Sequence, residues 1–165
     1  MPAEPIRERA KNAIADRLFS TIIAGAGYWH TPSIVTRSFL PLDQYINSPS
    51  YWPGPIIGIV RARGSTAKFD STGNMLSSFG IEHELIVDIN AYVHGDSTAP
   101  ADTRLERAWQ DIRTCLEADP KLGGIAEGIE LYGAEPMETD RGSWEPYGWM
   151  RQPWLVRLSE QVLLP

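Results

Sequence analysis

Residues 81–94, which read IEHELIVDINAYVH, alternate between apolar and polar side chains. The odd positions from Ile81 to Val93 are mostly apolar, and the even positions from Glu82 to His94 are mostly polar. Because successive side chains of a strand point to opposite faces, this pattern predicts a long strand with one buried and one mainly wet face. At about 3.3 Å per residue the strand is roughly 46 Å long, against a domain diameter of about 40 Å. We therefore expect part of it to project from the body.

One amphipathic helix is expected before this strand in the sequence and another after it. Residues 4–24 carry apolar side chains at spacings of three and four, and Gly25 ends the periodic stretch. Residues 101–118 show the same spacing, with Asp102 or Thr103 available as the N-cap. Each helix therefore has one apolar stripe to bury against the sheet.

Shorter segments complete the domain. Further strands are expected at 33–39, 56–63, 125–139 and 153–164, and long loops at 40–55, 64–78 and 141–154, rich in Pro, Gly or Ser. The order helix, three strands, helix, two strands predicts a single α+β domain over residues 1–165. It should have a mostly antiparallel twisted sheet, two helices on one face and a long protruding β-hairpin formed by residues 56–94.

Composition excludes several classes of protein. The 15 basic and 21 acidic residues give a net charge of −6, which argues against a general nucleic-acid binder. A single cysteine excludes an internal disulfide and a multi-cysteine zinc site. No apolar run approaches a membrane span, and the N-terminus carries charges where a signal peptide needs an apolar stretch. We expect a protein made and kept in the cytoplasm.

The sequence contains no strong catalytic motif. The GAGYWH segment at 25–30 follows a helix rather than a strand, and it lacks the third glycine of a phosphate-binding loop. His83 and His94 should lie on opposite faces of one strand, and we interpret them and His30 as three unrelated histidines. Cys115 falls on the apolar stripe of its helix, where a buried inert thiol is expected. We therefore predict neither a metal nor a cofactor.

One strand face does carry a row of carboxylates. Glu82, Glu84 and Asp88 share it with His94, and paired carboxylates can hold a cation or perform acid–base chemistry. Such a row is more often a solvated sheet face or a contact for a partner's Arg. The alternative hypothesis is nevertheless a small hydrolase that uses Glu84, Asp88 and His94.

Aromatic side chains gather in the loops rich in proline and glycine. Aromatic residues in such loops form protein interfaces or pack within the loops, and arginine is favoured at interfaces because its planar fork makes bidentate pairs. The candidate interface residues are Tyr51, Trp52, Arg61, Arg63, Trp144, Tyr147 and Trp149.

The negative charge is concentrated in residues 126–145, which hold six acids against one base, Arg141. The remaining residues are close to neutral. This segment is a candidate lumen wall that repels phosphate, or a docking patch for an Arg-bearing partner. Its candidate residues are Glu127, Glu130, Glu135, Glu138 and Asp140.

The second half of the chain resembles the tail-terminator (tail-completion, minor tail) proteins of long-tailed bacteriophages. The shared pattern is an alternating strand, a helix of the D-I-x-x-x-L type, the motif D-P-x-L-G-G and a strand, preceded by an N-terminal helix like IRERAKNAIADRL. The matching positions here are Asp111–Ile112, Leu116, Asp119–Pro120 and Leu122–Gly123–Gly124. The resemblance extends over nearly the whole chain, although its motifs are structural and loose.

The resemblance implies a structural virion protein of the tail or neck, made in the host cytoplasm. Such a subunit closes into a ring of six on the finished tail tube, ends tube polymerisation and presents a surface to the head–tail connector or stopper protein. DNA only passes through the lumen, no membrane is involved, and the family supplies no catalytic residue or cofactor. Loops 40–55 and 141–154 depart from a minimal member of the family.

The residues support self-association independently of the resemblance. A strand longer than its own domain offers an exposed edge to a neighbour, and a repeated head-to-tail contact gives a ring when the rotation closes. We expect strand 56–63 or 81–94, together with the first helix, to form the subunit interface. An oligomeric binding module outside any virus is the third hypothesis.

Overall fold

The computed structural model describes residues 5–47, 52, 54–63, 67–70, 78–133 and 146–163, with backbone only at 61–63, 67–70, 78–81 and 161–163. The helices are α1 (Ile6–Thr21), α2 (Asp43–Ile46), α3 (Ala101–Glu117) and a 3-10 turn at Leu122–Gly124. The strands are β1 (Ile34–Thr36), β2 (Ile56–Arg63), β3 (Ala67–Asp70), β4 (Ser78–His94), β5 (Gly128–Leu131) and β6 (Tyr147–Leu163). None of the helices in these ranges is both long and apolar enough to cross a membrane.

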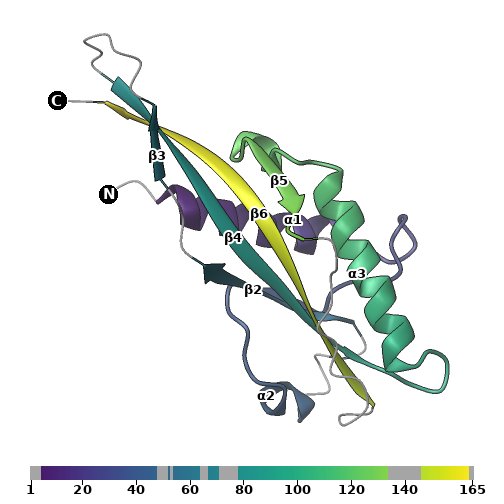
Figure 1. Ribbon diagram of the computed structural model, residues 1–165. Coiled ribbons are helices and arrows are strands. Elements are labelled where there is room, and N and C mark those ends of the chain that lie inside the picture. Colours follow the sequence, from purple (N-terminus) through teal and green to yellow (C-terminus); the bar gives the residue numbers. More distant parts are fainter. Residues whose placement is uncertain are drawn as a thin grey trace.

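The strands form one sheet in the order β1-β2-β4-β6-β5, with β3 paired to β4. Only β1 and β2 run parallel, whereas all other pairs are antiparallel. The long strands β4 and β6 pair along their whole length, from Ser78 opposite Leu163 to His94 opposite Tyr147. In Figure 1 these two strands run diagonally across the molecule and extend past α1 at one end. The expected α+β class with a mostly antiparallel sheet is confirmed.

One face of the sheet, here called the helix-covered face, packs against α1 and α3. Its β4 residues Leu85, Val87 and Ile89 are fully buried, as is Trp154 on β6. The helices contribute apolar stripes that meet these residues: Ala10, Ile14 and Leu18 from α1, and Leu105, Ala108, Ile112, Cys115 and Leu116 from α3. The prediction of two helices on one face, opposite the odd positions of the long strand, is confirmed.

The opposite face, here called the α2 face, carries the even positions of β4. Among the described residues it is covered at the end where α2 lies, and there Leu42, Tyr45 and Tyr92 form a second small core. Gly58 on β2 makes this packing possible, because a Cβ at this position would overlap the Phe39 ring and come within 2.8 Å of its Cβ. Phe39 instead stacks on Tyr92, with 4.4 Å between the ring centroids.

The structure corrects several expected boundaries. The 40–55 loop includes the four-residue helix α2, which fits between Pro41 and the prolines that follow. The expected loop 64–78 includes the strand β3, and β6 begins at Tyr147, within the expected loop 141–154. The connections at 64–66, 71–77 and 134–145 lie outside the described residues.

The pairing partners also differ from the expected 56–94 hairpin. Strand β2 pairs with the second half of β4, and β3 pairs with Gly80–His83 of its first half. The strand that follows β4 over its whole length is β6. The reason is that the apolar pattern of β6 continues back to Met150, so this strand is as long as β4.

No side-chain cap closes the start of α3. Pro100 occupies the N-cap position, and neither Asp102 nor Thr103 acts as the expected cap. The turn before the helix is held by Asp96, whose Oδ1 accepts hydrogen bonds from the Thr98 hydroxyl and from the backbone N–H groups of Thr98 and Ala99. These hydrogen bonds, foremost that of the Thr98 hydroxyl, lower the pKa of Asp96 to about 2.

Candidate interaction surfaces

The predicted aromatic residues that the structure describes lie together on the α2 face. The rings of Trp52 and Tyr147 are 5.3 Å apart between centroids, and both lie beside His94, at 5.6 and 5.0 Å. Trp149 packs against the same small core, and all these side chains are partly buried. The cluster agrees with the predicted packing among the loop aromatics, and its use as a protein interface stays a prediction. Tyr51, Trp144 and the side chains of Arg61 and Arg63 lie outside the described residues.

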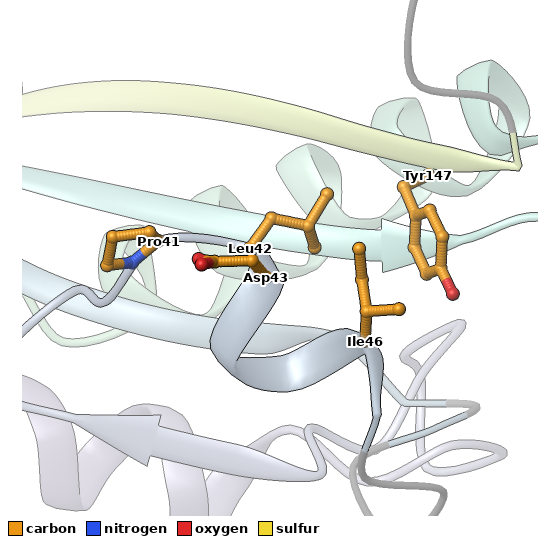
Figure 2. A pocket seen from close by; sticks show the side chains of 5 residues that line it. All are labelled: Pro41, Leu42, Asp43, Ile46 and Tyr147. Atoms are coloured by element: carbon orange, nitrogen blue, oxygen red, sulfur yellow. The ribbon is translucent and has the colours of Figure 1, made fainter.

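A shallow groove opens beside this cluster (Figure 2). It has a volume of about 370 Å³ and is lined by Pro41, Leu42, Asp43, Ile46 and Tyr147. Figure 2 shows Pro41 and Asp43 at one end of the groove and Tyr147 at the other. Leu40 and Ile46, which belong to the same segment, are more than a third exposed. Asp43 is the charged residue among the described residues of the lining.

A second exposed aromatic residue, Trp29, is presented on the other side of the molecule, beside α3. Its side chain is 58% exposed, and the guanidinium of Arg107 lies 4.6 Å from the centroid of its ring. Asp111 fixes the backbone beneath it: Oδ1 accepts the N–H of Trp29 at 2.9 Å, and Oδ2 accepts the N–H of His30 at 2.9 Å and its Nδ1 at 3.1 Å. Asp111 and His30 are buried, so the loop is held rigidly on the helix.

Three further apolar side chains are exposed elsewhere. Phe19 and Ile23, four residues apart at the end of α1, are 61% and 50% exposed. Tyr132, just after β5, is 47% exposed. With Trp29 and the groove residues, these side chains place exposed apolar groups on at least three separate elements.

Two of the three carboxylates of the strand face, Glu84 and Asp88, form ion pairs at separate places. Arg157 donates to Glu130 at 2.6 Å and lies 3.8 Å from Glu84, whereas Asp88 pairs with Arg151 at 3.0 Å. Glu84 and Asp88 are four residues apart on a strand, or about 13 Å, and His94 packs among the aromatic rings. The three side chains of the hydrolase hypothesis therefore do not converge on one pocket.

The three histidines have different surroundings. His30 bonds to Asp111, and His83 accepts a hydrogen bond from Arg7 at 3.2 Å and faces Glu160 at 3.6 Å. His83 belongs to the helix-covered face and His94 to the α2 face, as expected from their spacing. Across the described ranges no three residues among His, Cys, Asp and Glu are placed to share a metal ion.

The only cysteine, Cys115, is fully buried on α3. Burial raises the pKa of its thiol, which fits the expected inert side chain. Its backbone carbonyl accepts a hydrogen bond from Arg17 of α1, whose guanidinium also pairs with Asp119 at 3.2 Å. This region therefore fastens the two helices together.

Of the predicted acidic patch, the structure describes Glu127 and Glu130. Both are exposed, and Glu130 is paired with Arg157 on the α2 face. Glu130 is thus partly neutralised within the chain. Glu135, Glu138 and Asp140 lie outside the described residues.

Sequence reasoning missed Trp29, Phe19, Ile23 and the α2 groove. Trp29 was considered only as part of a failed phosphate-binding loop, although an aromatic pair between glycines and prolines is itself a signal of a presented side chain. Phe19 and Ile23 deviate from the buried stripe of α1 by one position, which exposes them. Comparison with models of known protein families and with curated proteins finds no match to the chain.

Proposed function

We propose that the chain is a ring-forming structural subunit that caps the tail tube of a long-tailed bacteriophage and joins it to the head connector. The resemblance in the second half of the chain supports the viral assignment. The matching motif positions occupy a continuous structural unit: Asp111–Ile112 and Leu116 lie on α3, and Leu122–Gly124 forms the 3-10 turn before β5. Asp119 makes this turn, accepting the N–H of Gly123 at 2.9 Å.

The observation that carries the proposal is the distribution of exposed apolar side chains. They lie at the end of α1, on the loop beside α3, around α2 and after β5, so they occupy both sides of the sheet. A ring subunit between two neighbours, with a tube below and a connector above, needs several separate contact surfaces. An enzyme, by contrast, needs one pocket where reactive groups converge.

The sheet edges support self-association and narrow the choice of interface strand. Strand β4 pairs with β6 on one side and with β2 and β3 on the other, so it offers a neighbour little free edge. Among the described residues, the outer edge of β6 is paired only around Pro153–Arg157, and that of β2 only at Ile56–Gly58. We therefore favour β2 and β6 over β4 as strands that a neighbour extends.

For the acidic segment we propose the same two alternatives as before, a lumen wall that repels phosphate or a docking patch for an Arg-bearing partner. Six subunits, each about 40 Å across and touching in a hexagon, leave a central hole of about 40 Å, which is wide enough for a DNA duplex. Unpaired acids on its wall would repel phosphate and let DNA pass. Glu127 is a candidate for this wall, whereas Glu130 is already paired with Arg157.

An elongation assay tests the proposal. Tail-tube protein of the same genome is induced to polymerise, and tube length is followed by light scattering and electron microscopy with and without the chain. We expect elongation to stop at substoichiometric amounts of the chain, with chain density at tube ends. Tubes that elongate at an unchanged rate, with no chain bound to them, would overturn the proposal.

A further inference from the structure

We propose that the groove lined by Pro41, Leu42, Asp43, Ile46 and Tyr147 receives Trp29 and Arg107 of a second copy of this chain. The inference rests on the proposed ring, and it assigns the residues that join one subunit to the next. It starts from two features of opposite charge, an exposed Trp beside an Arg and an apolar groove with an Asp in its described lining.

The donor surface is a presented aromatic residue with a positive charge. Trp29 is 58% exposed, and Arg107 lies over its ring at 4.6 Å. Arg107 has no ion-pair partner within the described ranges. Exposed Trp and Arg are the residue types that dominate binding energy at protein interfaces.

The acceptor surface is apolar with a negative charge. The groove of about 370 Å³ is lined by Pro41, Leu42, Ile46 and Tyr147, and Asp43 adds a negative charge to this described lining. Asp43 is exposed and, like Arg107, has no ion-pair partner among the residues that the structure describes. An indole in the groove with Arg107 beside Asp43 would bury apolar surface and form a new ion pair.

The two surfaces cannot meet within one chain. Trp29 is fixed to Asp111 of α3, which packs on the helix-covered face, whereas the groove lies on the α2 face. The contact between copies is therefore head-to-tail, and head-to-tail contacts generate rings when the rotation closes. The rigid hold of Asp111 on the loop reduces the entropy lost when Trp29 binds.

A charge-swap experiment tests the inference. Assembly of the full-length chain is measured by sedimentation velocity, and capped tube ends are counted by electron microscopy. Arg107→Asp and Asp43→Arg should each weaken assembly at least tenfold, and Trp29→Ala about 30-fold. The two charge variants mixed together, or combined in one chain, should assemble again because every contact regains a pair of opposite charges.

Arg113→Asp is the matched control. Arg113 also lies over a Trp ring of α3, 5.4 Å from the centroid of Trp109, but Glu117 already pairs with it at 2.7 Å. The Arg113→Asp variant should assemble as the wild type does. Circular dichroism checks the fold of every variant. Single variants that assemble normally, or a swap that restores nothing, overturn the inference. A wild-type chain that forms no ring, alone or on tubes, overturns the proposed function as well.

Discussion

On the helix-covered face of the sheet Leu85, Val87 and Ile89 are fully buried, whereas the β4 side chains that are buried on the α2 face, within the part of the chain that the structure describes, run from Asp88 to Tyr92. The first face packs against two long helices with regular apolar stripes. The second is covered by one short helix and by aromatic side chains from loops, and it leaves Glu84 and Ile86 partly exposed. The difference shows that the helix-covered face holds most of the described core, whereas part of the α2 face stays accessible.

The largest expected difference between the faces comes from two neighbouring residues of β6. Trp154 is fully buried on the helix-covered face, and its replacement by Ala should cost about 3–5 kcal/mol of unfolding free energy. Leu155 is half-buried on the α2 face, so Leu155→Ala should cost about 1 kcal/mol. Urea denaturation of both variants measures the contrast, and equal losses would contradict the distinction between the faces.

Two carboxylates, one buried on α3 and one exposed on the α2 face, extend the comparison between the two sides of the sheet. Asp111 is buried, and Asp111→Asn weakens its three hydrogen bonds to Trp29 and His30, which should cost about 1.5–3 kcal/mol. Glu130 is exposed on the α2 face, so Glu130→Gln should cost less than about 1 kcal/mol despite its contact with Arg157. Thermal unfolding of the two variants measures which loses more stability. A larger loss for Glu130→Gln than for Asp111→Asn would contradict the expected order.

Two glycines test how tightly the α2 face is covered where Phe39 lies. Gly58→Ala places a methyl group against the Phe39 ring and should cost about 1–3 kcal/mol. Gly128 of β5 has nothing within 4 Å of an added Cβ, so Gly128→Ala should be neutral or slightly stabilising. A Gly58→Ala protein as stable as the wild type would show that the Phe39 side chain does not pack against the sheet at Gly58.

The smallest effect on stability is expected from acid, which protonates Asp96 in the turn that joins β4 to α3. The pKa of Asp96 is lowered from 3.8 to about 2 in the folded protein. Its contribution to stability is therefore complete above about pH 4 and is lost as the pH falls towards 2. The stability difference between wild type and Asp96→Asn should shrink over this range, with the Asp96 carboxyl carbon titrating near pH 2 by NMR. A titration midpoint near 4 would show that the turn does not hold Asp96.

Much of the fold was predictable because burial imposes periodicity. The alternation in 81–94 correctly placed β4, and the apolar stripes correctly placed α1 and α3 on one face. The pairing of β4 with β6 was not predictable, because strand partners depend on the path of the intervening chain. The start of β6 was missed because Pro153 and Gly148 suggest a loop, although both fit the strand opposite Asp88 and Val93.

The candidate site was predictable only in part. Trp52, Tyr147 and Trp149 were identified as contact residues from their proline-rich context, and the structure places them in one cluster. Trp29 and Asp43 were not identified, because their interest lies in the groove and in the exposure of one ring, which only the folded chain defines. Glu84 and Asp88 share a strand face, but they lie about 13 Å apart along the strand and pair with different arginines.

Electron microscopy of the purified chain mixed with tubes of its own tail-tube protein tests the central claim most directly. The proposed function predicts six-fold rings, free or seated at one end of each tube, in class averages of the stained particles. A chain that stays monomeric at high concentration and is absent from every tube end would contradict it.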